Sequence, residues 1–364
     1  MIESNKARYF NRKNNKGILI ILFFVSPLIA FFYALKNFSK KNYQTIIPMF
    51  AFLYGFTFIP IENSDYERYL DYYQSLSNLN VNTAYDEIIN IYSSGVSFND
   101  AYAPILMYFI ILIGGSFHFF LGVQAIIYTY LLLSIINLII KKSTENQREK
   151  FFVFLIGCVF IYPLSSGINN IRFPTAFLFF CYFLLKYLFS KNLKYILIAG
   201  FSCFIHLAII QAYAVLILYY LLGYFKNYYL KILIVFVFAI FLNTLNIFQF
   251  NEYVGNNAMN TKVESYTNEN FISNREDHTQ KWNWYIQIKQ FAAYYFLLIT
   301  ILITRLPLFK LKGSSLTDSL FILSVLFLSL SLFNDTFLDS ISNRYRNFFV
   351  FLGLIYLYFT LGIN

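Results

Sequence analysis

The sequence predicts an all-α fold, a polytopic transmembrane helical bundle of about 11–12 spans that forms a single domain over residues 1–364. Hydrophobic residues make up 58% of the chain and charged residues only 13%, about half the charged share of a soluble domain. The apolar stretches are continuous and do not alternate, which argues against a β-barrel. Several uncharged runs reach the length that a membrane-crossing helix needs, and they cover 17–35, 42–61, 101–140, 151–171, 195–225, 232–251, 319–334 and 347–364.

The segments between these runs carry the charge, and its sign predicts the side of the membrane on which each segment lies. Segment 62–100 holds seven acidic residues and one basic residue, so we expect an outer loop there and a second outer loop at 252–284. By the positive-inside rule we expect four lysine-rich segments in the cytoplasm, namely 141–150, 186–194, 226–231 and 305–312.

The helices follow from these assignments, with one open question in the first half. Run 101–140 is long enough for two crossings and breaks at Gly114–Gly115. If 62–100 lies outside and 141–150 inside, only one of the two helices crosses, so we expect 103–115 to be a short re-entrant or interfacial helix. The alternative is a twelve-crossing chain with a cytoplasmic N-terminus, which moves 62–100 into the cytoplasm. In the second half we expect helices at 151–168, 173–190, 195–210, 211–224, 231–249, 285–304, 318–333 and 346–362.

Composition also narrows the function. The net charge of +10 does not indicate nucleic-acid binding, because most of the excess lies in the short lysine-rich loops. The three cysteines all lie inside apolar runs and are expected to be buried hydrophobes. The chain has no Walker loop, no HExxH motif and no paired-cysteine metal site. We therefore expect neither a cofactor nor a metal.

Arg172 is the strongest candidate for chemistry. It lies at the outer junction of two predicted helices, and Pro174 suits the first turn of the second helix. Free N–H groups and the positive end of the helix dipole favour an anion at such a position. Asn169 and Asn170 add polar groups beside it. The alternative is an arginine that reaches to lipid headgroups.

His206 is an ionisable residue inside an uncharged run. If its helix starts at Lys194, His206 lies about 18 Å along it, in the outer half of the bilayer. An ionisable group within a membrane span is a functional candidate. A core histidine bonded to a backbone carbonyl is the alternative.

Arg344 and Arg346 lie at the expected outer entry to the last helix, with Tyr345 between them. Such a cluster of donors suits a diphosphate. The alternative is a pair of salt bridges to Asp335 and Asp339.

The segment that begins at Asn63 predicts a capped helix in the first outer loop. Asp65, Arg68 or Tyr69, and Tyr72 are three and four residues apart, so they share one face. A carboxylate beside aromatic rings commonly holds a sugar, whereas the alternative is a solvated helix face. Further substrate-binding candidates are Tyr66 in this segment and, in the second outer loop, Arg275 and His278.

Taken in order, these motifs resemble the EpsG-type branch of the bacterial polysaccharide polymerases, the Wzy group. The similarity rests on an acidic Asp-Tyr-x-x-Tyr segment at 65–69 and on Asn-x-x-Arg from Asn169 to Arg172. It continues with His206 after a Phe-Ile pair and with Arg344-Tyr345 near the last helix.

The resemblance implies a GT-C-like glycosyltransferase of the bacterial inner (cytoplasmic) membrane with its active site facing the periplasm or exterior. Such an enzyme polymerises undecaprenyl-diphosphate-linked repeat units, and its partners would be the bilayer, a chain-length regulator and a flippase. Arg172 and Arg344 would clamp the diphosphate with support from Arg346, and His206 or Asp65 would accept the proton of the acceptor hydroxyl. The alternatives are a lipid-linked oligosaccharide flippase or an O-antigen ligase-type transferase.

Overall fold

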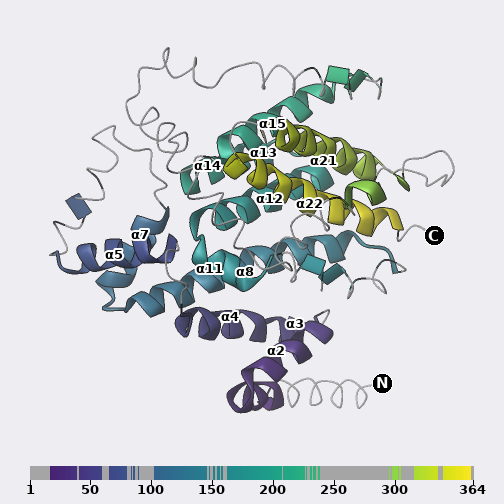
Figure 1. Cartoon of the computed structure of the whole chain (residues 1–364). Coiled ribbons are helices and arrows are strands. Elements are labelled where there is room, and N and C mark those ends of the chain that lie inside the picture. Colours follow the sequence, from purple (N-terminus) through teal and green to yellow (C-terminus); the bar gives the residue numbers. More distant parts are fainter. Residues whose placement is uncertain are drawn as a thin grey trace, which may run out of the picture. The chain divides into compact units, whose positions relative to one another are not determined.

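The computed structural model of the chain describes residues 17–38, 41–59, 65–79, 102–145, 162–206, 208–225, 315–334 and 339–361. It also describes isolated positions within 83–89, 147–158, 227–237 and 295–304. Every element in these residues is a helix, which confirms the all-α class (Figure 1).

The chain forms two units. Unit 1 contains α2 (Pro27–Lys36), α3 (Lys41–Gln44), α4 (Ile46–Phe56), α5 (Asp65–Ser77), α7 (Tyr102–Leu112), α8 (Phe117–Lys142) and α11 (Leu164–Asn169). It also holds the first part of α12 (Arg172–Ser190), whose second part belongs to unit 2. Unit 2 continues with α13 (Lys194–Gly200), α14 (Ser202–Ile205), α15 (Ile209–Leu222), α21 (Ser315–Asn334) and α22 (Asp339–Leu361).

Two helices in the described part of the chain are long and apolar enough to cross a membrane, α8 with 26 residues and α12 with 19. At about 1.5 Å per residue they extend about 39 Å and about 28 Å. Apolar helices such as α4, with 11 residues, and α15, with 14, are shorter.

Prolines explain several helix boundaries that hydropathy alone misses. Pro27 begins α2 and interrupts the predicted run 17–35 at Ser26, and Pro163 stands in an extended conformation just before α11. The prediction of one helix over 151–168 is therefore wrong, because proline cannot donate an N–H within a helix and tolerates only the first turn.

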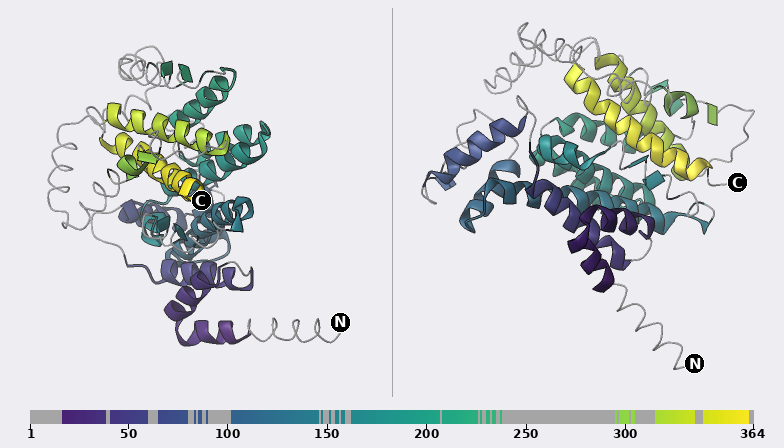
Figure 2. Two further views of the ribbon diagram at one scale, coloured as in Figure 1. Left: turned by 90° about the vertical axis from the view of Figure 1, so that its right-hand side faces the viewer. Right: turned by 60° about the horizontal axis from the view of Figure 1, so that its bottom comes forward.

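Helices α4 and α8 pack side by side in unit 1 (Figure 2). Their backbones approach closely at Gly55, where an added Cβ would lie 2.5 Å from the carbonyl oxygen of Leu121. Small residues at a contact are typical of helix pairs in membranes, where van der Waals packing drives association. Substitution of Gly55 would therefore force the two helices apart.

The break predicted at Gly114–Gly115 is confirmed. α7 ends at Leu112, α8 begins at Phe117, and Gly114 adopts a φ of 70°, a conformation that glycine takes without strain. With 11 residues, α7 extends about 16 Å, too short to cross a bilayer core. A re-entrant or interfacial position for α7 stays a prediction.

In unit 2, α21 and α22 form an antiparallel pair (Figure 2). The predicted start of the last helix at 346 is wrong, because α22 already begins at Asp339. Hydropathy marks 334–346 as a loop, yet the polar residues after Asp339 contain no proline or glycine to stop a helix. An acidic residue at the start also interacts favourably with the helix dipole.

Candidate functional site

A row of tyrosines on α5 forms the floor of the candidate site in unit 1. Tyr66, Tyr69 and Tyr73 recur every three to four residues and are buried, as is Leu76. Tyr66 packs edge-on against Phe117 with ring centroids 5.0 Å apart, and the Tyr73 hydroxyl donates to the carbonyl of Gly115. Burial raises the pKa of Tyr66 and Tyr73 above the ordinary tyrosine value, so both stay neutral. This face anchors α5 at the start of α8.

Arg172 is the first residue of α12, which starts one residue before the predicted position 173. Its Nε donates a hydrogen bond of 2.9 Å to the hydroxyl of Tyr69, and its guanidinium carbon lies 5.7 Å from the centroid of the same ring. The tyrosine therefore contacts the cation twice, by a hydrogen bond and through its ring face. The bond to Tyr69 uses Nε of the guanidinium.

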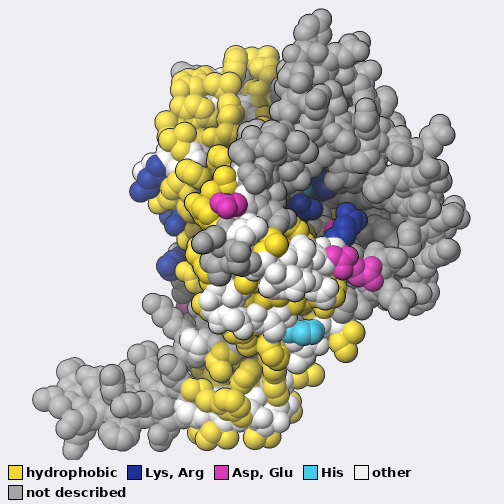
Figure 3. All heavy atoms as spheres, turned by 90° about the vertical axis from the view of Figure 1, so that its left-hand side faces the viewer, with side chains coloured by type: hydrophobic (Ala, Val, Ile, Leu, Met, Phe, Trp, Pro, Cys, Tyr) yellow, Lys and Arg dark blue, Asp and Glu magenta, His cyan; other side chains and the backbone are white. Residues whose placement is uncertain are grey.

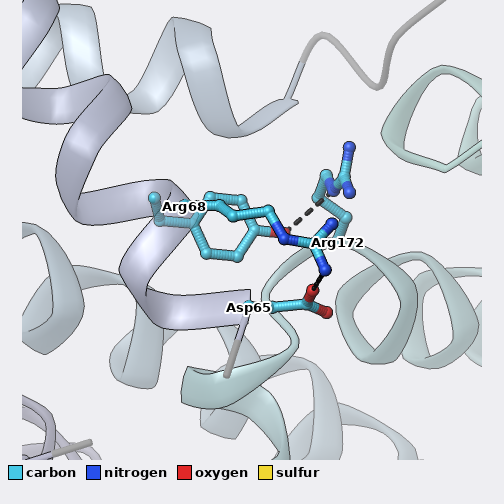
Figure 4. Close-up of polar contacts among 4 residues, drawn as sticks. Asp65, Arg68 and Arg172 are labelled. Atoms are coloured by element: carbon cyan, nitrogen blue, oxygen red, sulfur yellow. Dashed lines mark hydrogen bonds and ion pairs between the residues drawn. The ribbon is translucent and has the colours of Figure 1, made fainter. Parts of the chain in front are cut away.

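Asp65 and Arg68 form an ion pair of 3.2 Å at the first turn of α5. Their side chains are 38% and 80% exposed, so water screens the pair and its contribution to stability is small. Figure 4 shows both arginines and Asp65 pointing into the same space between α5 and the start of α12. On the face where α5 lies, basic side chains gather beside acidic ones (Figure 3). The Asp65 carboxylate thus pairs with Arg68, while Arg172 bonds to Tyr69.

The two asparagines before Arg172 differ in their surroundings. Asn170 is exposed and occupies the bend between α11 and α12, with φ −119° and ψ 75°. The Oδ1 atom of Asn169 is buried and accepts no hydrogen bond from the described residues. A donor from a bound ligand would satisfy it.

His206 lies between helices rather than inside one. It caps α14 in an extended conformation with φ −155° and ψ 120°, and α15 begins three residues later. Its N–H donates to the carbonyl of Ser202, and its own carbonyl accepts from the N–H of Ile209. The predicted continuous helix over 195–210 is therefore wrong, and the height of about 18 Å derived from it no longer holds.

The arginines of unit 2 lie in the second and third turns of α22, not at its entry. Arg344 and Arg346 are two positions apart on a helix, so their side chains point about 200° apart. Tyr345 is 2% exposed, stacks on Phe327 and donates a hydrogen bond to Oε1 of Gln211 on α15. Here the tyrosine points inward between the two arginines.

The predicted site residues do not all lie in one unit. Arg172 and Tyr69 are in contact, and Asp65 and Arg68 lie in the same unit beside them. Arg344, Tyr345, Arg346 and His206 belong to unit 2. Arg275 and His278 lie outside the described residues, as does the whole of the loop 252–284. Among the residues that the structure describes, no group of three His, Cys, Asp or Glu side chains could hold a metal ion.

Sequence reasoning missed two glutamines, Gln124 on α8 and Gln211 on α15. Gln211 is the only amide side chain of α15, and Gln124 is 13 residues from the next amide of α8, Asn137. That signal was available, because polar side chains in such helices usually bond to a neighbouring helix.

Comparisons with known proteins add no family to this picture. No family model matches the chain, and neither a curated protein nor a solved structure matches it.

Proposed function

We propose that the chain is a polytopic, GT-C-like membrane glycosyltransferase that joins glycan repeat units carried on a polyprenyl diphosphate. The donor glycan leaves its diphosphate and passes to the terminal sugar of a second carrier-linked unit. Arg172 binds the diphosphate and stabilises the negative charge that grows on it as the glycosidic bond breaks. Arg344, with Arg346 in support, is the second candidate for this clamp. His206 or Asp65 takes the proton of the acceptor hydroxyl.

The contact between Arg172 and Tyr69 is the observation that carries this proposal. A guanidinium held at the first residue of a 19-residue helix combines a fixed charge with the free N–H groups of the first turn. Its terminal nitrogens match the spacing of phosphate oxygens. Tyr69 fixes the group before the ligand arrives, which lowers the entropy lost on binding.

The geometry within unit 1 also supports an outer position for this site. Arg172 is bound by Tyr69 on α5, and α5 packs against Phe117 at the start of α8. Lys141 and Lys142 stand at the other end of α8, about 39 Å away. If α8 crosses the membrane, the positive-inside rule assigns the lysines to the cytoplasm and Arg172 to the outer face.

Transfer by purified protein in detergent tests the proposal, because detergent removes the two membrane sides. With synthetic carrier-linked repeat units, we expect a ladder of longer carrier-linked glycans. A flippase would give no product under these conditions, and a ligase would transfer only to a different acceptor. Absence of any transfer to carrier-linked acceptors would contradict the proposal.

Cysteine labelling in intact cells tests the orientation separately. Ser77 at the end of α5 and Thr144 just after α8 are both exposed and would lie on opposite sides. We expect an impermeant maleimide to label Ser77→Cys and not Thr144→Cys, with the parent protein as the control for its native cysteines. The reverse pattern would place Arg172 in the cytoplasm and exclude an outward-facing site.

A further inference from the structure

A network of hydrogen bonds centred on Gln124 lies next to the start of α12, where Arg172 is. Gln124 is fully buried in α8. Its Nε2 donates to the hydroxyl of Thr175 at 2.8 Å and to the carbonyl of Gly167 at 3.1 Å, with the carbonyl of Ile171 3.4 Å away. Its Oε1 accepts from the hydroxyl of Tyr102 at 2.6 Å. One amide thus joins α7, α8, α11 and α12 inside unit 1.

The chemistry of these partners fixes the orientation of the amide. Backbone carbonyls can only accept, so the NH2 group must face Gly167 and the oxygen must face Tyr102. The Thr175 hydroxyl gives its own hydrogen to the carbonyl of Ile171 at 2.7 Å, so toward Gln124 it can only act as an acceptor. Each hydrogen in the network therefore has one main acceptor. A fully satisfied buried network of this kind specifies a single arrangement.

The carbonyls that this network binds belong to the break that orients Arg172. α11 ends at Asn169 and α12 begins at Arg172, so the last carbonyls of α11 lose regular helical partners. Gln124 supplies a replacement donor for the carbonyl of Gly167, and the Thr175 hydroxyl adds a donor to the carbonyl of Ile171, the residue before Arg172. Without the donor from Gln124, the cost of burying a free Gly167 carbonyl would favour another path for the chain at this point.

We propose that Gln124 is a positioning residue: it holds the start of α12 so that Arg172 presents its guanidinium to the diphosphate. The inference rests on the proposed function for the identity of the ligand, but not for the effect on the start of α12. Gln124 itself touches no substrate in this account. It acts through Gly167, Thr175 and the backbone that precedes Arg172.

The same helix provides a matched control. Asn137 of α8 also makes an amide contact to another helix, exchanging hydrogen bonds of 2.9 Å and 3.1 Å with Gln44 of α3. It lies 13 residues further along α8, about 20 Å from Gln124. Gln124→Leu and Asn137→Leu therefore both remove one amide from one helix, and only the first acts on the start of α12.

Two measurements on the full-length purified protein test the inference. Hydrogen–deuterium exchange should speed up at peptides covering 164–178 in Gln124→Leu and not in Asn137→Leu. The affinity for undecaprenyl diphosphate should fall by about tenfold to 100-fold in Gln124→Leu only, the range that misplacing a positioning group can cost. Thr175→Val should show both effects in weaker form. Thr175→Ser keeps the hydroxyl, so its exchange and affinity should match those of the parent protein. These two variants also serve if Gln124→Leu does not fold.

The outcomes separate the two proposals. Equal exchange and equal affinity in the Gln124 and Asn137 variants would overturn the positioning role. If the parent protein does not bind the diphosphate at all, the proposed function fails, and exchange at 164–178 still decides whether Gln124 holds the start of α12.

Discussion

Units 1 and 2 each contain a buried tyrosine near an arginine, but the two residues are in contact in unit 1 and are neighbours in the sequence in unit 2. In unit 1, Tyr69 reaches from α5 to Arg172 at the first residue of α12, so the hydroxyl binds the cation itself. In unit 2, Tyr345 lies between two arginines on the same helix and turns inward to Gln211. The helical twist then sends Arg344 and Arg346 to opposite sides of α22.

The difference shows that the surroundings of an arginine depend more on its position in the helix than on its neighbours in the sequence. Arg172 has a helix N-terminus, a tyrosine from another helix and an exposed ion pair nearby, and these contacts support the proposed anion site. The arginines of α22 lie past its first turn, where the dipole has little effect. We therefore expect the larger share of diphosphate binding in unit 1.

The largest expected effect is the loss of transfer in Arg172→Ala, and it distinguishes unit 1 from unit 2. Arg172→Ala should lower transfer by about 10²–10³-fold, the usual loss when one preorganised donor is removed from a transition state. Arg346→Ala should cost less than about tenfold, since helix geometry turns it away from Arg344. Arg172→Lys keeps the charge without the planar fork and should fall between them. Equal losses in Arg172→Ala and Arg346→Ala, at equal amounts of membrane protein, would contradict the comparison.

Removing the hydroxyl of Tyr69 is the next test. Tyr69→Phe retains the ring and loses the hydrogen bond to Arg172, so the cation is less fixed before it meets the ligand. We expect the affinity for undecaprenyl diphosphate to fall about tenfold, as for a hydrogen bond to a charged group. The melting temperature in detergent should change little. A large fall in melting temperature with unchanged affinity would show that Tyr69 is only structural.

The same change from tyrosine to phenylalanine in unit 2 should lower stability and leave diphosphate affinity unchanged. Tyr345→Phe removes the donor to Gln211 and leaves a partly buried acceptor without it. We expect the free energy of unfolding to fall by about 1 kcal/mol and diphosphate affinity to stay the same. Thermal unfolding and titration on one sample measure both quantities. Loss of affinity without loss of stability would assign Tyr345 to the binding site.

The smallest effect is expected from Asp65→Asn. The ion pair with Arg68 is exposed, so stability should change by less than about 0.5 kcal/mol. Removing this negative charge should leave diphosphate binding equal or slightly tighter. A loss of transfer by about 10²-fold or more would instead identify Asp65 as the general base.

The sequence predicted those features that depend on local chemistry. Pro174 correctly indicated a helix start at or near Arg172, and Gly114–Gly115 correctly indicated a break. The partner of Arg172 could not be found in this way, because Tyr69 is 103 residues distant in the chain. Only packing decides which of several tyrosines on α5 faces the guanidinium.

Other differences between the predicted and the observed helices arise where hydropathy does not mark the ends of a helix. Hydropathy joined 195–210 into one helix, whereas the chain breaks at His206. It also began the last helix at 346, although polar residues from Asp339 onward are already helical. On α5 the tyrosine row is buried, while the side chains of Asp65 and Arg68 are 38% and 80% exposed.

A direct titration of lipid phosphates tests the central claim, that Arg172 held by Tyr69 forms a diphosphate site. Undecaprenyl diphosphate and undecaprenyl monophosphate are titrated into the purified parent protein and into Arg172→Ala in identical nanodiscs. We predict that the parent protein binds the diphosphate about tenfold more tightly than the monophosphate, and that Arg172→Ala loses this preference. Equal affinities for the two lipids in the parent protein, or a preference unchanged in Arg172→Ala, would contradict the claim.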